Sequence, residues 1–369
     1  MNQKASNDSP KRIQQPLLTW FRKAARDLPW RRTRDPYAVW LSEVILQQTR
    51  VDQGLPYYER FIHAFPTVHA LAAAPESTVL KLWEGLGYYS RARNLHRAAK
   101  QILEEHGGTF PQTANELAKL PGVGPYTAGA VASIAFGERV PVEDGNVKRV
   151  LTRLYAIEER IDSGPVSARL WALAGTLVSK SHPGDFNQAL MELGARVCTP
   201  KQPDCPRCPL RRQCGAYAAG IASDLPVRRA RKSVPHKELA VAAIRRNGRY
   251  LIVRRPSSGL LGGLWEFPNG PLEPGEDPAR ALERIAASLA GVSVKPGKVV
   301  ASVNHAYSHL KVTMTVYLCE AAAGGEVALR EHTNSQWVRP SAFEQYAFPK
   351  AHHKFLHLLQ EQTSLRRET

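Results

Sequence analysis

Four of the five cysteines of this chain lie within 17 residues, at Cys198, Cys205, Cys208 and Cys214. Their spacing, C-x6-C-x2-C-x5-C, does not resemble a secreted disulfide framework and is typical of a metal site. Four thiolates suit either a tetrahedral zinc ion or an iron–sulfur cluster, and the spacing alone leaves both open. The fifth, Cys319, lies in an expected strand and fits a small buried hydrophobe.

The chain divides into two parts with different hydrophobic periodicity. From 14 to 221, apolar residues recur at three- and four-residue spacing between Pro and Gly breaks, which predicts an all-α domain. From 238 to 360, two apolar runs flank Asn247-Gly248, LKVTMTVYLCE alternates as a strand, and PARALERIAASLAG predicts a helix that ends at Gly291. This second domain is expected to be α+β. The other segments are expected to be a disordered N-terminus (1–13), a basic connector (222–237) and a polar tail (361–369).

The charge balance of the 369 residues favours an anionic partner. Fifty Lys and Arg against 33 Asp and Glu give a net charge of +17, and nucleic acid is the commonest partner for such a chain. Charge alone does not separate DNA, RNA and acidic membrane. The N-terminus has no apolar core, and no apolar run approaches membrane-spanning length, so we expect no membrane association. The expectation is a monomeric cytoplasmic protein, associated with the nucleoid if its source is bacterial.

A glycine-rich turn lies between two expected helices in LPGVGPYTAGAV. Gly122 and Gly124 permit a tight turn with positive φ and leave backbone N–H groups uncovered. The helix N-terminus behind the turn is a suitable phosphate site, although a plain αα-hairpin explains the spacing equally well.

Two carboxylates stand out as candidates for chemistry. Glu43 lies among apolar residues in YAVWLSEVILQQ, where burial would raise its pKa and make it a proton donor, or it faces water from a polar stripe. Asp144 precedes the helix of GNVKRVLTRLY, either as a plain N-cap or as a fixed anion where positive charge develops. The basic residues just beyond, Lys148, Arg149 and Arg153, suit a phosphate backbone.

Taken together, these motifs resemble the helix-hairpin-helix DNA glycosylase superfamily, in the branch that carries a 4Fe–4S cluster. Within it, LPWRRTRDPYAVWLSEVILQQTRV (28–51), WEGLGYYSRARNL (83–95), LPGVGPYTAGAV, EDGNVKRVL and the cysteine spacing are similar to the A/G-specific adenine DNA glycosylase (MutY) family. The resemblance runs from about 14 to 356. It implies hydrolysis of the N-glycosidic bond of adenine mispaired with 8-oxoguanine or guanine in double-stranded DNA, which leaves an abasic site. It also implies a 4Fe–4S cluster rather than zinc at the four cysteines.

The resemblance implies a role for each candidate residue. Glu43 would protonate N7 of the flipped adenine, and Asp144 would stabilise the oxocarbenium-like sugar or act as a transient nucleophile. Tyr126 stands where bifunctional relatives carry a lysine that forms a Schiff base, so the resemblance implies a monofunctional enzyme. The adenine pocket would be lined, with Tyr126, by Trp30, Arg31, Leu46, Val51 and Gln188. The opposite base would be contacted by Gln48, Thr49, Leu86 and Tyr88, and the DNA backbone by Gly122, Gly124, Lys148 and Arg149.

The C-terminal domain resembles a Nudix fold with an altered metal box. Gly270, Glu276, Arg284 and Gly291-Val292 keep the spacing of that box. The positions that would hold magnesium are Ile285, Ser288 and Leu289, and these side chains do not supply the oxygen ligands that the ion needs. We therefore expect a domain that recognises a base without hydrolysing nucleotides.

Two further positions depart from the family pattern. In the family a Phe-Ser-His loop reads 8-oxoguanine, and the corresponding residues here are Tyr307, Ser308 and His309, with His305 nearby. Glu143 replaces a usually apolar residue beside Asp144, where like-charge repulsion would raise the pKa of Asp144.

Three other functions fit parts of the sequence. A thymine-glycol-type repair enzyme with lyase activity is disfavoured by Tyr126 and by the additional C-terminal domain. A Nudix hydrolase tethered to DNA is disfavoured by the altered metal box. A non-catalytic DNA-binding protein would use the cluster and the hairpin as scaffold only. The sequence leaves open whether the cluster is structural or redox-active.

Overall fold

The computed structural model describes residues 10–229, 233–273, 275–307, 309–322, 327–329 and 332–364. The chain forms two compact units: Met1–Ala73 with Asn94–Arg231, and Ala74–Arg93 with Lys232–Thr369. The sequence-based domain boundaries differ from this division at residues 74–93, which they place in the helical domain.

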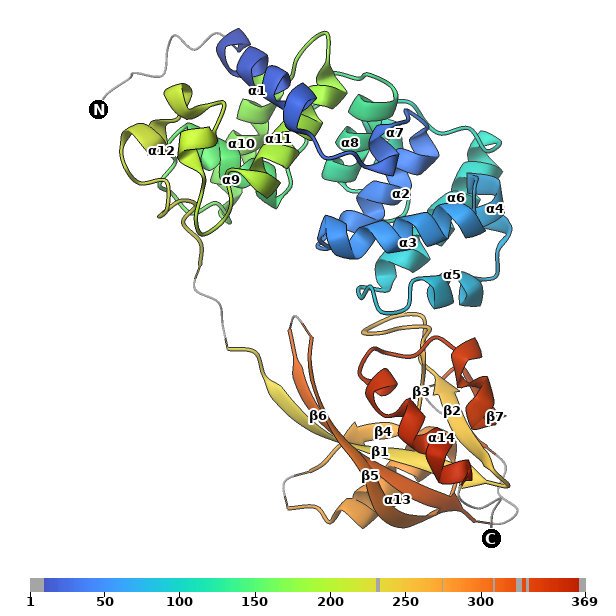
Figure 1. The fold of residues 1–369 in the computed structure, drawn as a ribbon. Coiled ribbons are helices and arrows are strands. Elements are labelled where there is room, and N and C mark those ends of the chain that lie inside the picture. The colour runs from blue at the N-terminus through green and yellow to red at the C-terminus, as the bar shows by residue number, and fades with distance from the viewer. Residues whose placement is uncertain are drawn as a thin grey trace. The chain divides into compact units, whose positions relative to one another are not determined.

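The first unit is helical in every regular element that the structure describes, which confirms the predicted all-α domain (Figure 1). Its longer helices are α1 (Lys11–Ala24), α2 (Pro36–Leu46), α3 (Val51–Ala64), α4 (Val68–Ala73), α6 (Ser90–His106, which starts in the other unit), α8 (Pro125–Ala135), α9 (Gly145–Leu154), α10 (Gly164–Leu177) and α11 (Pro183–Arg196). Its short elements are η1 (Pro29–Arg31), α7 (Ala114–Leu117), η2 (Cys205–Arg207), η3 (Arg211–Gln213) and α12 (Gly215–Ala218).

Helix α2 lies at the centre of this unit. Asp35 caps its N-terminus by accepting a hydrogen bond from the Tyr37 N–H, and every residue from Tyr37 to Ile45 is buried. The helix packs against α3 and α8, and α8 in turn packs against α11. Because α2 is enclosed on all sides, a polar residue on it must lie in the protein interior or face a cavity.

The ends of the chain are more helical than the sequence suggested. Helix α1 begins at Lys11, inside the segment expected to be disordered, because Ile13 and Leu17 bury their side chains in the core. Helix α14 (Leu356–Ser364) likewise extends into the expected tail. The disorder expected for 1–9 and the tail at 365–369 lie outside the described residues.

The second unit contains a seven-stranded mixed sheet, which confirms the predicted α+β domain. Its order is β3-β2-β1-β6-β5, with β4 paired to β1 and β7 paired to β2. The strands are β1 (His236–Arg246), β2 (Arg249–Arg254), β3 (Trp265–Glu266), β4 (Asn269–Pro271), β5 (Val294–Ala306), β6 (Lys311–Ala321) and β7 (Asn334–Val338). Strands β1 and β6 run parallel, and the other described pairs are antiparallel.

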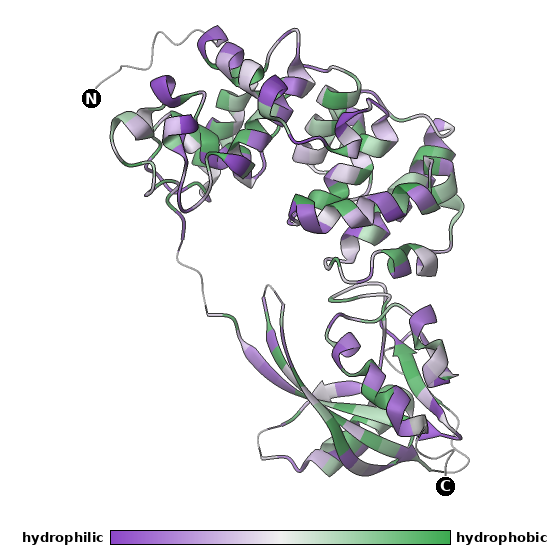
Figure 2. Cartoon of the chain, in the orientation of Figure 1, coloured by the Kyte–Doolittle hydropathy of each residue, from purple (hydrophilic) through white to green (hydrophobic). Residues whose placement is uncertain are grey.

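Hydrophobic residues cover both faces of this sheet. Helix α13 (Pro278–Ala290) covers one face, and η4 (Pro340–Gln345), η5 (His352–Lys354) and α14 cover the other. Strand β2, whose inner residues are all buried, is drawn largely in the hydrophobic colour in Figure 2. A sheet buried on both faces reads as continuous apolar runs, which is why AVAAI and YLIV lack strict alternation.

The predicted turns and caps of this unit are confirmed. Asn247 and Gly248 both have positive φ, +50° and +70°, as the turn between β1 and β2 requires. Gly291 ends α13 in the left-handed conformation at φ +64°. In the altered metal box, Ile285 is only 2% exposed and belongs to the core, while Glu276 forms a 2.7 Å ion pair with Arg284.

Residues 74–93 of the second unit carry α5 (Glu76–Leu82) and are held against the sheet domain by polar contacts. Glu84 accepts a 2.7 Å hydrogen bond from the Phe348 N–H and lies 2.9 Å from His353 Nε2. Lys81 donates to the Tyr346 carbonyl at 3.1 Å. These contacts explain why the segment groups with residues far away in the sequence. No helix that the structure describes is long and apolar enough to cross a membrane.

Candidate active site

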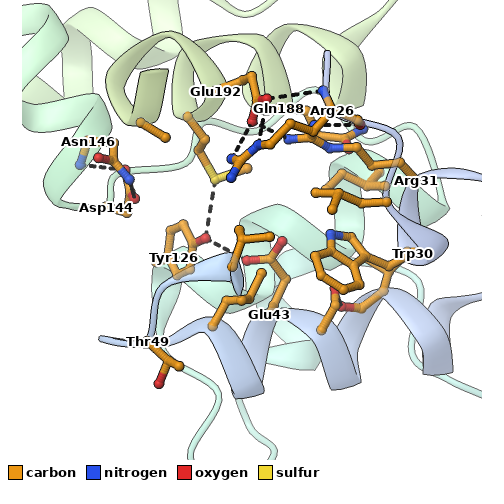
Figure 3. Close-up of a pocket in the computed structure, with 18 residues that line it drawn as sticks. Arg26, Trp30, Arg31, Glu43, Thr49, Tyr126, Asp144, Asn146, Gln188 and Glu192 are labelled. Atoms are coloured by element: carbon orange, nitrogen blue, oxygen red, sulfur yellow. Dashed lines mark hydrogen bonds and ion pairs between the residues drawn. The ribbon is translucent and has the colours of Figure 1, made fainter. Parts of the chain in front are cut away.

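A pocket in the first unit brings together residues from α2, α8, α11 and the segments that precede α2 and α9 (Figure 3). Its lining contains Arg26, Leu28, Trp30, Arg31, Val39, Ser42, Glu43, Leu46, Thr49, Val51, Tyr126, Ile134, Asp144, Asn146, Gln188, Met191, Glu192 and Ala195. Both candidate carboxylates, Glu43 and Asp144, therefore face the same cavity.

Glu43 is a buried carboxyl group on the pocket wall. It is 6% exposed, and Tyr126 donates a 2.5 Å hydrogen bond from its Oη to Glu43 Oε2. Burial raises the pKa of Glu43 to about 7; the hydrogen bond from Tyr126 opposes this shift, and the negative charge of Asp144 adds to it. Burial also raises the pKa of Tyr126 well above its ordinary value. Glu43 can thus hold a proton near neutral pH, whereas Tyr126 remains a hydrogen-bond donor.

Asp144 is the N-cap of α9 and also faces the pocket. Its Oδ1 accepts hydrogen bonds from the N–H groups of Asn146 and Val147 at 2.9 and 2.7 Å, and its Oδ2 accepts one from Asn146 Nδ2 at 2.8 Å. Gly194 of α11 allows this turn to pack closely, because a Cβ there would lie 2.6 Å from Asn146 Cβ. The capping and the catalytic interpretations of Asp144 are therefore compatible.

The pKa of Asp144 is raised, as expected, but the expected cause is wrong. Burial is the largest influence, and the hydrogen bonds from Val147 and Asn146 oppose it. Glu143 is paired with Lys148, with 3.2 Å between Oε1 and Nζ, so its charge is largely neutralised.

All residues that the sequence suggested for the adenine pocket line this one cavity. Trp30 is buried and packs edge-on against Tyr58 at 4.9 Å between ring centroids. Arg31 lies 5.3 Å above the ring of Phe21. Thr49, suggested for the opposite base, also lines the cavity.

Sequence reasoning missed a charged cluster in the same wall. Glu192 of α11 has a fully buried side chain and binds Arg26 in a bidentate manner, at 2.9 Å to Nε and 2.7 Å to Nη2. Arg31 Nη2 lies 2.9 Å from the same carboxylate. Burial alone would raise the pKa of Glu192, but the hydrogen bonds from the two arginines outweigh it and hold the pKa at about 2. The only sequence signal was an acidic residue at a helical core position of MELGAR.

The four residues suggested for the opposite base differ in exposure. Gln48 and Tyr88 are exposed and have left-handed backbones, at φ +57° and +47°. Such conformations are strained for non-glycine residues and concentrate at functional sites. Leu86 is only 5% exposed, so its side chain is part of the packed interior rather than a free wedge.

Of the residues suggested for the DNA backbone, the two glycines lie in the turn before α8. Gly122 has φ +75°, and a Cβ there would lie 2.6 Å from Asn94 Cβ. Gly124 is the N-cap of α8 at φ −85°, so the positive φ expected for both glycines occurs at Gly122 and not at Gly124; a Cβ at Gly124 would meet no heavy atom within 4 Å. The turn therefore leaves the N-terminus of α8 open to an anion.

The suggestion for Arg149 requires correction. Its guanidinium is buried and donates to the carbonyls of Gly194 and Cys198, both at 2.7 Å, and to Asn146 Oδ1 at 2.8 Å. Arg153 is buried in the same way and donates to Thr199 and other carbonyls. These arginines bind the cysteine segment and the Asp144 turn rather than facing solvent. Lys148 is half-buried.

The four cysteines lie around one cavity. Its lining contains Cys198, Cys205, Cys208 and Cys214 together with Arg153, Val197, Pro203, Asp204, Arg211, Tyr217 and Ala222. Arg153 Nη1 lies 3.3 Å from Cys198 Sγ. Among the described residues, no three His, Cys, Asp or Glu side chains meet closely enough to hold one metal ion.

Of the residues suggested for lesion recognition, Tyr307 and His309 lie at the turn between β5 and β6. Tyr307 packs against the hydrophobic core of that face and contacts His305 at 4.6 Å between ring centroids. Burial raises the pKa of Tyr307 to about 12. His309 is exposed, and Ser308 lies outside the described residues.

Comparison with known proteins finds a separate family match in each of the two units. Residues 41–175 match the model of the HhH-GPD superfamily of base excision DNA repair proteins, and residues 240–358 match the NUDIX domain model. The chain is 39% identical to the adenine DNA glycosylase of Homo sapiens, covering 94% of this chain and 73% of that protein. It is 33% identical to the adenine DNA glycosylase of Buchnera aphidicola from Schizaphis graminum, covering 79% and 83%. A solved thermostable thymine-DNA glycosylase is 31% identical, with a TM-score of 0.51, covering 57% of this chain and 97% of that one.

Proposed function

Because the chain belongs to the adenine DNA glycosylase family, a group of base excision repair enzymes that hydrolyse N-glycosyl bonds to remove adenine, we propose that its substrate is adenine mispaired with 8-oxoguanine or guanine in double-stranded DNA. The observation that carries the proposal is the buried Glu43, bonded to Tyr126 in a pocket that it shares with Asp144. The adenine would leave the helix and enter this pocket.

Glu43 acts as the general acid in this proposal. An adenine anion is a poor leaving group, so the N-glycosidic bond breaks more easily when N7 is protonated as the bond lengthens. A carboxyl group with a pKa of about 7 holds a proton at neutral pH and still gives it up readily. Once the base has left, the ionised Glu43 can accept a proton from the attacking water.

Asp144 supplies the negative charge that the sugar needs. As the base departs, positive charge develops on the deoxyribose, and a carboxylate fixed before that moment stabilises it without reorganisation. The three hydrogen bonds from Asn146 and Val147 hold the Asp144 carboxylate in one orientation. The same position suits a transient covalent bond to the sugar carbon, by the two-carboxylate logic of glycoside hydrolysis.

Tyr126 supports a monofunctional enzyme that leaves the abasic site intact. Strand cleavage by a lyase needs an amine that forms a Schiff base with the opened sugar. The residue at this point of the hairpin is a tyrosine, whose hydroxyl is engaged with Glu43 and with Met191 Sδ at 3.2 Å.

The four cysteines would hold a 4Fe–4S cluster. The donor set fits, because four thiolates are the ligands that a 4Fe–4S cluster takes and all four cysteines line one cavity. The buried guanidinium of Arg153 lies beside Cys198 and would offset part of the negative charge of the thiolates. A bound cluster would supply a rigid scaffold for the 198–214 loop or a redox centre.

Double-stranded DNA would bind to the first unit through the open α8 N-terminus and the glycine turn before it. A helix N-terminus favours a phosphate because its first N–H groups lack helical partners, and in α8 these belong to the residues after Pro125, which itself has no N–H. Reading of 8-oxoguanine is assigned to Tyr307 and His309, at the turn between β5 and β6, and by the family resemblance to Ser308. Tyr88 and Gln48 are the exposed candidates for contact with the opposite base.

A single-turnover assay with three duplexes tests the proposal, with adenine placed opposite 8-oxoguanine, guanine or thymine. We expect adenine release from the first two only, and strand breaks only after treatment with alkali. Strand breaks without alkali would contradict the monofunctional assignment. Equal release from all three duplexes would contradict the proposed substrate.

A further inference from the structure

Glu192 is the one carboxylate of the pocket whose pKa is lowered rather than raised. It lies on α11, with its side chain fully buried, and takes no part in the proposed chemistry. A carboxylate buried in this way is stable only if cations pair with it.

Two pocket arginines are fixed by this carboxylate. Arg26 binds both carboxylate oxygens, and Arg31 binds Oε2 and also donates to the Arg26 carbonyl at 3.2 Å. In Figure 3 both guanidinium groups are joined to Glu192 by dashed lines, and all three side chains lie along one wall of the pocket. Arg196 approaches the carboxylate from the next turn of α11, at 3.8 Å.

The position of these cations matters because Glu43 faces the same pocket. A positive charge near a carboxyl group favours its ionised form and therefore removes the proton that a general acid must hold. Arg31 already acts on Glu43 in this direction. The groups that act on Glu43 are the neutral hydroxyl of Tyr126 and the charged Arg31 and Asp144. Those that face Glu192 are Arg26, Arg31 and Arg196.

We propose that Glu192 is a positioning residue for the glycosylase reaction: its ion pairs hold Arg26 and Arg31 against the pocket wall and keep their positive charge from deprotonating Glu43. The arginines then remain available to contact the substrate without disabling the acid. This inference rests on the proposed role of Glu43.

The pH dependence of adenine release in a Glu192→Gln variant tests the inference. Glutamine keeps the size of the side chain and removes its charge, so Arg31 loses its ion-pair partner in the pocket that it shares with Glu43. In the native enzyme the single-turnover rate should fall as the pH rises, because Glu43 loses its proton; we call this part of the pH profile the falling limb. In the variant we expect the falling limb to move by about one pH unit toward lower pH. The rate loss relative to the native enzyme would then be about tenfold larger well above the limb than well below it.

Three variants separate this effect from a merely structural one. Glu192→Asp keeps the charge and should restore the native limb. The double variant Glu192→Gln with Arg31→Gln removes the positive charge of Arg31 as well. Its falling limb should return to the native pH, even if its maximal rate is lower. Glu266→Gln, which breaks a similar buried pair with Arg255 in the other unit, should leave the limb unmoved. A loss of rate that is equal at every pH in Glu192→Gln would overturn the inference.

A second variant tests the inference if Glu192→Gln does not fold, and a failure of the proposed function can be told apart from a failure of this inference. If Glu192→Gln fails to fold, Arg31→Gln alone replaces it, and the limb should then move to higher pH; an unmoved limb or one at lower pH would overturn the inference. The proposed function fails separately, since in that case the native enzyme releases no adenine or keeps its falling limb in a Glu43→Gln variant.

Discussion

Tyr126 Oη donates a 2.5 Å hydrogen bond to Glu43 Oε2, across 83 residues of sequence. The bond joins the helix behind the glycine turn to the buried central helix α2. It stabilises the ionised form of Glu43, whereas burial favours the protonated form, and burial prevails. The hydrogen bond thereby keeps the pKa of Glu43 near neutral pH rather than far above it.

Replacing Tyr126 with phenylalanine should shift the pH dependence of adenine release. The variant removes a hydrogen bond that lowers the pKa of Glu43, so the pKa rises and the falling limb moves to higher pH. Rates across the pH range, under single-turnover conditions, measure the shift. A limb at the native position would show that the hydrogen bond does not act on the catalytic proton.

Replacing Glu43 with glutamine should remove the acid without disturbing the fold. The amide is nearly isosteric and carries no titratable proton, so adenine release should fall by roughly 10²–10⁴-fold, the usual contribution of a general acid. Binding to the mispaired duplex, measured by fluorescence anisotropy, should stay close to native. Undiminished release would exclude Glu43 as the acid.

Asp144 offers a way to separate capping from catalysis. Asparagine caps a helix about as well as aspartate, so Asp144→Asn should change the free energy of unfolding by less than about 0.5 kcal/mol and still abolish adenine release. Asp144→Ala should lose the activity and also about 1 kcal/mol of stability. If the asparagine variant kept full activity, Asp144 would be a cap and nothing more.

Arg149 should prove to be structural, contrary to the sequence-based suggestion. Arg149→Gln removes a buried guanidinium that binds three carbonyls and Asn146, so it should cost about 3 kcal/mol. Thermal unfolding should then occur roughly 6–12 °C lower. Lys148→Gln, a matched change one residue away, should cost less, because Lys148 is half-buried and has two side-chain partners, Glu143 and Ser167, where Arg149 has four. A native unfolding temperature combined with weaker, less salt-dependent DNA binding would restore the original suggestion.

The cysteine cavity predicts a loss of iron in single variants. Cys205→Ser should lower the iron content per protein and destabilise the 198–214 loop, since the other three thiolates would hold an incomplete cluster. Iron content and thermal unfolding measure the two effects. Full zinc occupancy and no iron in the native protein would contradict the proposal that the four cysteines hold a 4Fe–4S cluster.

The local elements were predictable because their signals are local. Asn247-Gly248 can form a primed turn, Gly291 can adopt a left-handed cap, and the three- and four-residue periodicity of YAVWLSEVILQQ is that of a helix. The candidate carboxylates were singled out from their local sequence, and the other pocket residues came from the resemblance to the adenine DNA glycosylase family. All of them do lie around one cavity.

What the sequence did not reveal depends on burial and on contacts between distant residues. Arg149 looks like any basic residue of an exposed helix, and only the packing of α9 against α11 shows that its donors are used internally. The same holds for Glu192, whose partners lie more than 160 residues earlier in the chain. Residues 74–93 group with the sheet domain through contacts such as Glu84 with His353, which no local pattern encodes.

The most direct test of the account is the pH dependence of adenine release by the native enzyme under single-turnover conditions. Glu43 must be protonated to act as the acid, so the rate should fall as the pH rises through about 7, the pKa of Glu43. Asp144 must be ionised, so the rate should also fall toward low pH, at a midpoint above the ordinary pKa of an aspartate. The upper limb should vanish in Glu43→Gln. A rate that does not fall above neutrality, or an upper limb that persists in that variant, would contradict the assignment of Glu43 as the proton donor.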